Sequence, residues 1–362
     1  MSSASESDSA SRLGQDPERP FAAGIGMVVI GRNEGERLRR CLTSLGELVA
    51  QAVYVDSGST DGSVAMAQQM GATVVELDTN RPFTAARARN AGFAKLVSNR
   101  EVAQPIEHVQ FVDGDCEVES NWLQVAAAAL AAEPELAVVF GRRRERHPER
   151  TPYNQLCDLE WDVPVGDVLS CGGDAMMRVA AFQQVGGFDE ARIAGEEPEL
   201  CLRLRASGHR IRRIDAPMTV HDADMHRLSQ WWQRAVRAGY VEAEGVAEHG
   251  KKYPRWKSAL STLVWALALP AAAGTAGFFV GWLWGWPYAA LVAVLLLLCY
   301  LRLYRRIQQR ASQRWAEPHA HLYARFCTLG KWPQAQGMFV YWWRRLMRRD
   351  RTLIEYKQAA TR

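Results

Sequence analysis

Short apolar runs alternate with stretches of helical periodicity in the first third of the chain. Apolar runs at 27–30, 52–55, 73–77 and 109–112 predict four buried β-strands. The stretches 36–48, 62–70 and 84–95 between them carry the spacing of helices, and Gly71 follows the second. Strands that alternate with helices predict an α/β domain with a parallel, doubly wound sheet. In such a sheet, ligands bind at the carboxyl ends of the strands.

Polar clusters follow the first two of these strands. The clusters hold Asn33 and Glu34 after the first strand, and Asp56, Ser57, Ser59 and Asp61 after the second. Side chains of these types can hydrogen-bond the base and ribose of a nucleoside, and the loops lack the glycine spacing of dinucleotide-binding or P-loop sites. Taken singly, the same residues also fit turns and helix caps. Two clusters at equivalent strand ends favour a nucleotide site.

Asp113 and Asp115 stand at the end of the fourth strand, on either side of Gly114. Carboxylates at this spacing can both approach a hard cation, whose other positions are then filled by water and phosphate oxygens. The same residues also fit an Asp-Gly turn. The metal interpretation makes a diphosphate the expected ligand.

The helical stretch before this strand carries Arg87, Arg89 and Asn90. It leads to the same edge of the sheet, where a guanidinium group can clamp phosphates with its planar fork of donors. The alternative is a solvated pair of arginines, and this suits Arg87 better than Arg89.

In this order, the motifs resemble the inverting, GT-A fold glycosyltransferases of family 2. The resemblance is carried by Asn33-Glu34, by Val55-Asp56-Ser57-Gly58-Ser59-Thr60-Asp61-Gly62, by Ala88-Arg89-Asn90 with Gly92, and by Phe111-Val112-Asp113-Gly114-Asp115. It extends over about residues 26–245. It implies that Asp56 contacts the nucleotide base, and that Asp113 and Asp115 reach the ribose, the diphosphate and a Mg²⁺ or Mn²⁺ ion. Gly31-Arg32 stands where the family usually has a proline.

The second half of the same region resembles the acceptor side of this family. It holds Gly172, Gly173 and Asp174, the turn 185–189, and Glu196-Glu197 at the start of a helical stretch that ends near Gly208. The family usually has Glu-Asp at this point, with the aspartate as catalytic base. We assign this role to Glu197, with Glu196 as second choice, because an acceptor hydroxyl must lose its proton as it attacks the sugar. Acids at a helix N-terminus also complement the helix dipole.

His221 and Trp231 complete the candidate residues. The resemblance implies that His221, after a further strand, completes the metal shell, although a lone histidine is often structural. Trp231 is a candidate for the acceptor side or a packing residue. The run Trp231-Trp232-Gln233-Arg234 has the elements of the family's processive motif in the wrong order, so we expect the addition of a single sugar.

The 362 residues are 48% hydrophobic, enough for a catalytic domain and an accessory region. Seven cysteines without a CxxC pair predict reduced thiols in the cytosol, and neither a disulfide framework nor a zinc site. Residues 1–24 are polar and lack the apolar core of a signal peptide, which predicts a disordered tail. We expect the GT-A catalytic domain to occupy residues 25–250.

No residue from Ser258 to Leu301 is charged. This is too long for one membrane span of about 20 residues and suits a transmembrane helical hairpin at 258–304, with arms near 259–282 and 287–304. Lysines and arginines flank both ends, which places both ends in the cytosol. Pro270 is expected to kink the first arm. A re-entrant hairpin, suggested by the short second arm, and a buried hairpin of a soluble core are the alternatives.

The net charge of +4 hides a basic segment at 305–362. Aromatic residues and arginines mix there, most densely at 339–349, which predicts an amphipathic helix on the cytosolic leaflet with its arginines on lipid phosphates. RNA-binding proteins use similar residues. The neighbouring hairpin favours membrane lipids, and no nucleic acid partner is expected.

These observations predict a membrane-anchored, bacterial-type glycosyltransferase. It would move one sugar from a nucleoside diphosphate sugar, with a divalent metal, to a membrane-proximal acceptor in envelope or exopolysaccharide synthesis. The expected acceptor is a lipid-linked glycan, and the catalytic domain would lie on the cytosolic side of the inner membrane. Two alternatives remain: a polyprenyl-phosphate glycosyltransferase, whose ionised acceptor needs no base, and a non-catalytic scaffold that binds sugar nucleotides.

Overall fold

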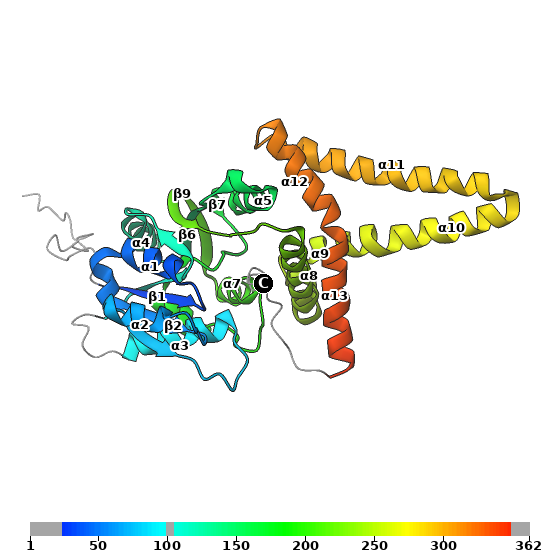
Figure 1. The fold of residues 1–362 in the computed structure, drawn as a ribbon. Helices are drawn as coiled ribbons and strands as arrows, with labels where there is room; N and C mark the ends of the chain where they lie inside the picture. The colour runs from blue at the N-terminus through cyan, green and yellow to red at the C-terminus, as the bar shows by residue number, and fades with distance from the viewer. Residues whose placement is uncertain (1–23, 99–104, 349–362) are drawn as a thin grey trace, which may run out of the picture.

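The computed structural model describes residues 24–98 and 105–348 (Figure 1). An α/β region comes first, and a long helical hairpin with two further helices follows it. Apart from Gly24, the predicted N-terminal tail lies outside the described residues, as do residues 349–362 of the predicted basic segment.

The described strands belong to one sheet. Their bounds are β1 Ile25–Gly31, β2 Ala52–Asp56, β3 Thr73–Glu76, β4 His108–Asp113, β5 Cys116–Val118, β6 Leu136–Glu145, β7 Gly166–Asp167, β8 Ala175–Arg178 and β9 Arg210–His221. The order in the sheet is β3-β2-β1-β4-β8-β6-β9-β5, and β7 pairs with β9. All four strands that the apolar runs predict are present.

The direction of the strands corrects one prediction. Strands β3, β2, β1 and β4 are parallel, as expected. Strand β8, however, runs antiparallel to both β4 and β6, so the sheet is mixed. An apolar run indicates that a strand is buried but carries no information on the direction in which it runs.

Helices cover the sheet and follow it. Their bounds up to the hairpin are α1 Glu36–Ser44, α2 Ser63–Gln69, α3 Ala85–Ser98, α4 Trp122–Ala132, α5 Pro152–Trp161, α6 Val179–Gln184, α7 Glu196–Ala206 and α8 Leu228–His249. The first is shorter than predicted, because Gly46 adopts a φ of 56° and a 3₁₀ helix covers Gly46–Gln51 instead.

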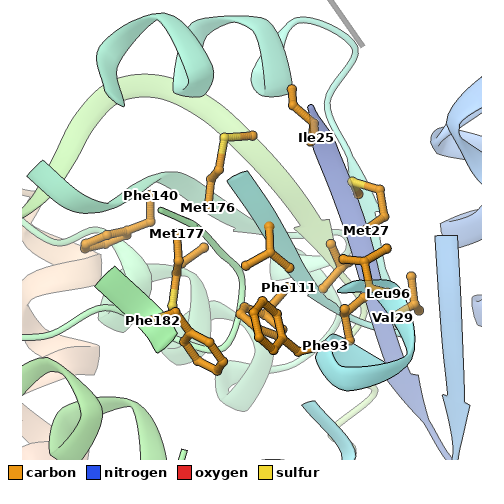
Figure 2. Packing of buried hydrophobic residues seen from close by; sticks show 14 of the residues in the cluster. Ile25, Met27, Val29, Phe93, Leu96, Phe111, Phe140, Met176, Met177 and Phe182 are labelled. Carbon is orange, nitrogen blue, oxygen red and sulfur yellow. The ribbon is translucent and has the colours of Figure 1, made fainter. Parts of the chain in front are cut away.

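Helix α3 lies directly on the sheet. A Cβ atom on Gly92 would lie 2.4 Å from a side-chain carbon of Val28, so only glycine allows this approach. Phe93 of the same helix meets Phe182 with ring centroids 4.7 Å apart, in the aromatic cluster around Phe111 (Figure 2). This packing fixes α3, and therefore the arginines on it, relative to the carboxyl ends of β1 and β4.

The hairpin projects away from the sheet (Figure 1). Its elements are α9 Trp256–Leu263, a π-helical turn Val264–Ala268, α10 Leu269–Trp284 and α11 Trp286–Ala311. The helices Trp256–Trp284 and Trp286–Ala311 are long and apolar enough to cross a membrane, by length and composition. The second arm, with 26 residues, is longer than predicted. The π-helical turn directly precedes Pro270, whose ring cannot donate a hydrogen bond to the preceding turn.

The C-terminal helices α12 (Glu317–Leu329) and α13 (Lys331–Leu346) return to the α/β region. Helices α8 and α13 pack backbone to backbone, since Cβ atoms on Gly239 and Gly337 would each lie 1.9 Å from a carbonyl oxygen of the other helix. One face of the predicted amphipathic helix is therefore buried in protein. Its other face exposes aromatic side chains, with Phe339 65% exposed. Helix α13 passes the base of the hairpin (Figure 1).

Candidate active site

Asp113 and Asp115 lie at the carboxyl end of β4, and the pairing of β5 with β9 brings His221 to them. Cys116 is opposite His221 in the ladder, and His221 Nε2 lies 3.2 Å from Asp115 Oδ2. Asp115 and His221 are both buried. Residues that are 106 positions apart in the chain therefore form one cluster, as the resemblance implies.

This cluster suits a divalent metal ion. Ligand atoms of Asp115, Cys116 and His221 all lie within 4.8 Å of one another. Carboxylate oxygens and imidazole are ligands that Mn²⁺ and Mg²⁺ accept. Burial raises the pKa of the Cys116 thiol well above its ordinary value, which keeps the sulfur protonated and a poor ligand for a hard cation. Asp115 and His221 are thus the better ligands in this group.

Asp113 is held by guanidinium groups. Arg89 Nη2 donates to Asp113 Oδ1 at 2.8 Å, and Arg143 Nη2 lies 3.5 Å from Asp113 Oδ2. Burial alone would raise the pKa of Asp113, but these two cations outweigh it and hold the pKa below its ordinary value. Asp113 is therefore a carboxylate in a cationic surrounding that also attracts phosphate.

The two loops predicted to bind the nucleoside are joined to each other. Asn33 donates from its backbone to Ser59 Oγ at 2.9 Å and accepts from the Thr60 backbone at 2.8 Å. Asp56 is 2% exposed and accepts from the Tyr54 hydroxyl and from the Gly58 and Ser59 backbones. Asp56 thus organises this loop through its own hydrogen bonds.

Of the other predicted residues of these loops, two line the cleft and one forms part of a turn. Ser57 and Glu34 line the cleft beside Asp113, and Glu34 pairs with Arg37 at 2.9 Å. Asp61 accepts from the backbone and the hydroxyl of Ser63, so it satisfies the first backbone N–H of α2.

Three polar residues of α3, namely Arg87, Arg89 and Asn90, have distinct surroundings. Arg87 is buried and donates to the backbone carbonyls of Asp78, Arg81 and Pro82, so the expectation of a solvated Arg87 is wrong. Asn90 exchanges two hydrogen bonds with the backbone of Phe188. Arg89 is the one of the three whose guanidinium group contacts the acids of the site.

Glu196 and Glu197 open α7, as predicted, after Gly195 with a φ of 77°. Arg89 Nη1 lies 2.6 Å from Glu196 Oε1 and 3.6 Å from Glu197 Oε1, while the other terminal nitrogen of Arg89 holds Asp113. Burial and the neighbouring charge of Glu196 raise the pKa of Glu197 to about 7. The two glutamates and the two aspartates therefore share one region.

The predicted acceptor-side residues lie in two places. Gly173 packs on Arg89 and Asp113, and Gly172 faces open space. Asp174 is 1% exposed and accepts from the Asp113 backbone at 3.0 Å, so it supports the metal end of the site. Trp231 is buried against Phe326 of α12, with ring centroids 4.9 Å apart, and presents no face to an acceptor.

Comparison with known proteins matches part of this chain to a family. A family model described as glycosyl transferase family 2 matches residues 27–185. This stretch is a glycosyltransferase family 2 domain. The chain is 28% identical over 204 residues to the succinoglycan biosynthesis protein ExoA of Rhizobium meliloti (strain 1021). The aligned stretch covers 55% of this chain and 61% of that protein. It is 27% identical over 267 residues to a pre-mycofactocin glycosyltransferase of Mycobacterium tuberculosis (strain CDC 1551 / Oshkosh), covering 69% and 54%.

The fold is that of a solved glycosyltransferase. The mannosyltransferase PcManGT from Pyrobaculum calidifontis, in complex with GDP-Man and Mn²⁺, superposes with a TM-score of 0.53 at 16% sequence identity, covering 88% of this chain and 87% of that one. The α/β region therefore has the GT-A fold. The chain spans 61% and 54% of the lengths of the two curated relatives above.

The cleft beside Asp113 has a volume of about 370 Å³. It contains Asp113, Asp115 and His221 together with Arg32, Arg143, Arg234 and Arg237. Glu196 and Glu197 are linked to Asp113 through Arg89 and are not among the residues that line this cleft. The two aspartates can hold a metal ion, and the arginines around them can balance the negative charge of a diphosphate.

Two residues of the family 2 domain were missed in the sequence analysis. Arg143 of β6 lines the cleft, pairs with Asp174 at 2.8 Å and lies over the ring of Trp161. Glu145 Oε2, at the end of the same strand, lies 3.7 Å from His221 Nδ1. The signal that points to them is Arg142-Arg143-Arg144-Glu145, a charged run that ends a strand whose first half is apolar.

Proposed function

We propose that this chain is an inverting glycosyltransferase that moves one sugar from a nucleoside diphosphate sugar to an acceptor held at a membrane surface. The main support for this proposal is the pair of hydrogen bonds made by Arg89, whose two terminal nitrogens donate to Asp113 and to Glu196. Through it, acids suited to a metal-diphosphate and an acid suited to a base lie in one region of the GT-A domain.

Asp115 and His221 are the residues that would hold a divalent metal, with Asp113 beside them. The ion would neutralise the charge that develops on the departing diphosphate. Arg143, at the same end of the cleft, can contribute a fixed positive charge to the same group. The loop joined by Asn33 and Ser59, with Ser57 next to it, would receive the nucleoside.

Glu197 is the better candidate for the base. Glu196 is occupied by a hydrogen bond to Arg89 at 2.6 Å, whereas Glu197 is further from this cation and more exposed. A pKa of about 7 lets the carboxylate accept a proton near neutral pH. The acceptor oxygen would form its bond to the anomeric carbon as the bond to the diphosphate breaks, and Glu197 would keep the proton.

The membrane placement and the acceptor class belong to the same proposal. The two apolar arms support a membrane-anchored chain with the GT-A domain on the cytosolic side, since Lys251 and Lys252 precede the hairpin and Arg302 to Arg310 follow it. The similarity to ExoA, named for succinoglycan biosynthesis, supports an acceptor in envelope or exopolysaccharide synthesis. A lipid-linked glycan is the acceptor that this position suits.

A nucleotide panel tests the donor half of the proposal. The full chain in lipid nanodiscs is heated with GDP, UDP, CDP or dTDP, with and without Mn²⁺. One nucleotide should raise the melting temperature only in the presence of the metal, because ligand that binds the folded state stabilises it. Asp115→Asn should abolish this rise. Asp167→Asn, which changes an exposed partner of Arg210 and Arg212 outside the cleft, should not.

Transfer of a labelled sugar into lipid-extractable product tests the other half. We expect Glu197→Gln to bind the donor normally and to lose transfer. Retained transfer onto polyprenyl phosphate in this variant would instead indicate an acceptor that needs no base. If no nucleotide stabilises the chain, the proposal fails, and a chain that binds the donor without any transfer or hydrolysis is a scaffold.

A further inference from the structure

A second cavity lies where the hairpin meets the C-terminal helices. Its volume is about 630 Å³, and we call it the basic cavity. The cations that line it are Arg302, Arg306 and Arg310 of α11, Arg314 just after that helix, and Lys331 at the start of α13. No acidic side chain is among its lining residues, all of which lie in the described part of the chain.

Arg302, Arg306 and Arg310 form a row along one face of α11. Residues four apart in a helix are neighbours on its surface, and like charges at this spacing destabilise the helix. Within residues 24–98 and 105–348, no carboxylate forms an ion pair with any of the three. A row of cations that repel one another and lack an acidic partner is a binding surface for an anion.

Lys331 adds an unusual charge to this surface. Its side chain is buried, with 9% exposed, and no acid among the described residues lies within 4 Å of its ammonium group. The charge of Glu242 acts on Lys331 but offsets only part of the cost of burial. Burial lowers the pKa of Lys331 below its ordinary value. An anion bound in the basic cavity would offset this penalty, because an opposite charge favours the protonated ammonium group.

The other walls of the basic cavity are apolar. Trp265 of the first arm and Leu303 and Ile307 of the second line it. The cavity also begins where the uncharged part of α11 ends, at Leu301. A ligand with a phosphate at one end and a long hydrocarbon chain at the other matches this order of surfaces, with the chain along the exposed apolar face of the hairpin.

The basic cavity is connected to the catalytic cleft by the end of α5. Trp161 lines the cleft. The next residue, Asp162, accepts a hydrogen bond from Trp315 Nε1 at 3.2 Å and pairs with Arg314 at 3.4 Å, and both of these residues line the basic cavity. A headgroup held by the arginines therefore lies next to the wall of the site where transfer would take place.

We propose that the basic cavity binds the diphosphate of a lipid-linked acceptor and so presents its sugar to the cleft. This inference rests on the proposed glycosyltransferase function and adds the residues that recognise the acceptor. Arg302, Arg306, Arg310 and Lys331 bind the phosphate oxygens. Trp265 and the apolar face of the hairpin contact the lipid chain.

Binding of radiolabelled farnesyl diphosphate to the full chain in phosphatidylcholine nanodiscs tests the assignment. We expect saturable binding that weakens by about tenfold or more in the double variant Arg306→Gln, Arg310→Gln and in Lys331→Met, because each loses charge-assisted hydrogen bonds. Lys331→Arg should restore most of the binding. Arg305→Gln is the matched control, since Arg305 is exposed on the same helix but does not line the cavity, and it should bind within about twofold of the wild type.

Competition identifies the ligand. Inorganic diphosphate and phosphatidylglycerol should compete poorly, because the first lacks the chain and the second carries a single bridging phosphate. Equal competition by phosphatidylglycerol would make the basic cavity an anchor for bulk anionic lipid and overturn the inference, as would equal weakening by Arg305→Gln or unchanged binding in both cavity variants.

Nucleotide binding, measured on the same samples, separates this inference from the proposed function. A chain that binds a nucleoside diphosphate with Mn²⁺ but not farnesyl diphosphate overturns the acceptor assignment and leaves the proposed function intact. A chain that binds farnesyl diphosphate through Arg306 and Arg310 but no nucleotide overturns the proposed function, and with it the role of the lipid as acceptor.

Discussion

The carboxylate of Glu197 lies 3.6 Å from Arg89, a side chain that is almost fully buried. The same guanidinium group holds Glu196 at 2.6 Å and Asp113 at 2.8 Å. One cation therefore balances carboxylates from β4 and from α7, two elements far apart in the sequence. This arrangement has consequences for stability as well as for chemistry, since a buried acid without its cation is strongly unfavourable.

Replacement of Arg89 by methionine should therefore destabilise the chain. The variant leaves Glu196 buried without a partner, and we expect a loss of about 3–5 kcal/mol in the free energy of unfolding. Urea denaturation of the full chain in detergent micelles measures it. Arg81→Met is the control, because the Arg81–Glu190 pair is exposed and should contribute less than about 1 kcal/mol. Equal effects of the two variants would show that the Arg89 contacts are not what stabilises this region.

Glu197 should be the group whose titration produces the acid limb of the pH–rate profile. Because burial and Glu196 raise its pKa to about 7, the carboxylate is protonated and inactive at lower pH. We expect kcat/KM to rise about tenfold per pH unit below 7 and to level off above it. Glu197→Gln should lower the rate by a factor of about 10²–10⁴ and remove the limb. Glu196→Gln should lower the rate but keep the acid limb of the pH–rate profile. Loss of this limb in Glu196→Gln and not in Glu197→Gln would make Glu196 the base.

Stability should change with pH in the opposite sense. The pKa of Glu197 is higher in the folded chain than its ordinary value of 4.5, so the folded state binds more protons between about pH 4.5 and 7. Its contribution to the free energy of unfolding is present below this window and is lost as the pH rises through it. Thermal melting of Glu197→Gln across the window should show a smaller decline with pH than the wild type.

Glu145 should strengthen metal binding by orienting His221. Its Oε2 lies 3.7 Å from His221 Nδ1, while His221 Nε2 faces Asp115. A carboxylate at Nδ1 keeps the proton there and leaves Nε2 free for the metal. We expect Glu145→Gln to weaken Mn²⁺ binding by about 10–100-fold, measured by electron paramagnetic resonance of the free ion in the presence of the preferred nucleotide. His147→Ala, next to this cluster but half-exposed, should bind Mn²⁺ as the wild type does.

The sequence predicted the parts of the site that lie at the ends of apolar runs. Asp113 ends β4 and Asp115 lies two residues later, so a local pattern locates them, and the family resemblance linked them to Glu197 and His221. Arg87 shows the limit of such patterns, since an arginine on a helix gives no sign that it is buried against three backbone carbonyls. Arg143 and Glu145 were missed because their partners, Asp174 and His221, become neighbours only through the pairing of β6 with β8 and β9.

The same limit applies to the helices after the sheet. The uncharged run predicted a hairpin, and its arms were found, but the return of α13 onto α8 depends on Gly239 and Gly337, whose role is visible only when the two backbones are seen together. Likewise, the sequence left open whether Trp231 is an acceptor-side or a packing residue, and it is buried by Phe326, a residue nearly a hundred positions later. Local composition carries no record of such contacts.

Two adjacent glycines allow a sharp test of how tightly the site is packed. A Cβ atom on Gly173 would lie 2.5 Å from Arg89 Nη2 and 3.0 Å from Asp113 Oδ2, whereas one on Gly172 would meet nothing within 4 Å. Arg89 cannot move aside without leaving its carboxylates. We therefore expect Gly173→Ala to displace Arg89, to lower kcat/KM by about tenfold or more, and to shift the acid limb of the pH–rate profile. A tenfold loss corresponds to a barrier that is higher by about 1.4 kcal/mol.

Gly172→Ala should change neither quantity, since the added methyl group enters open space. The two variants differ in one methyl position and share the same loss of backbone freedom, so a difference between them reports on contact with Arg89 and Asp113. Measured transfer rates and their pH dependence are compared at saturating metal. Equal activity of the two variants would mean that Arg89 and Asp113 can separate without cost, and that the ion pair between them does not position the site.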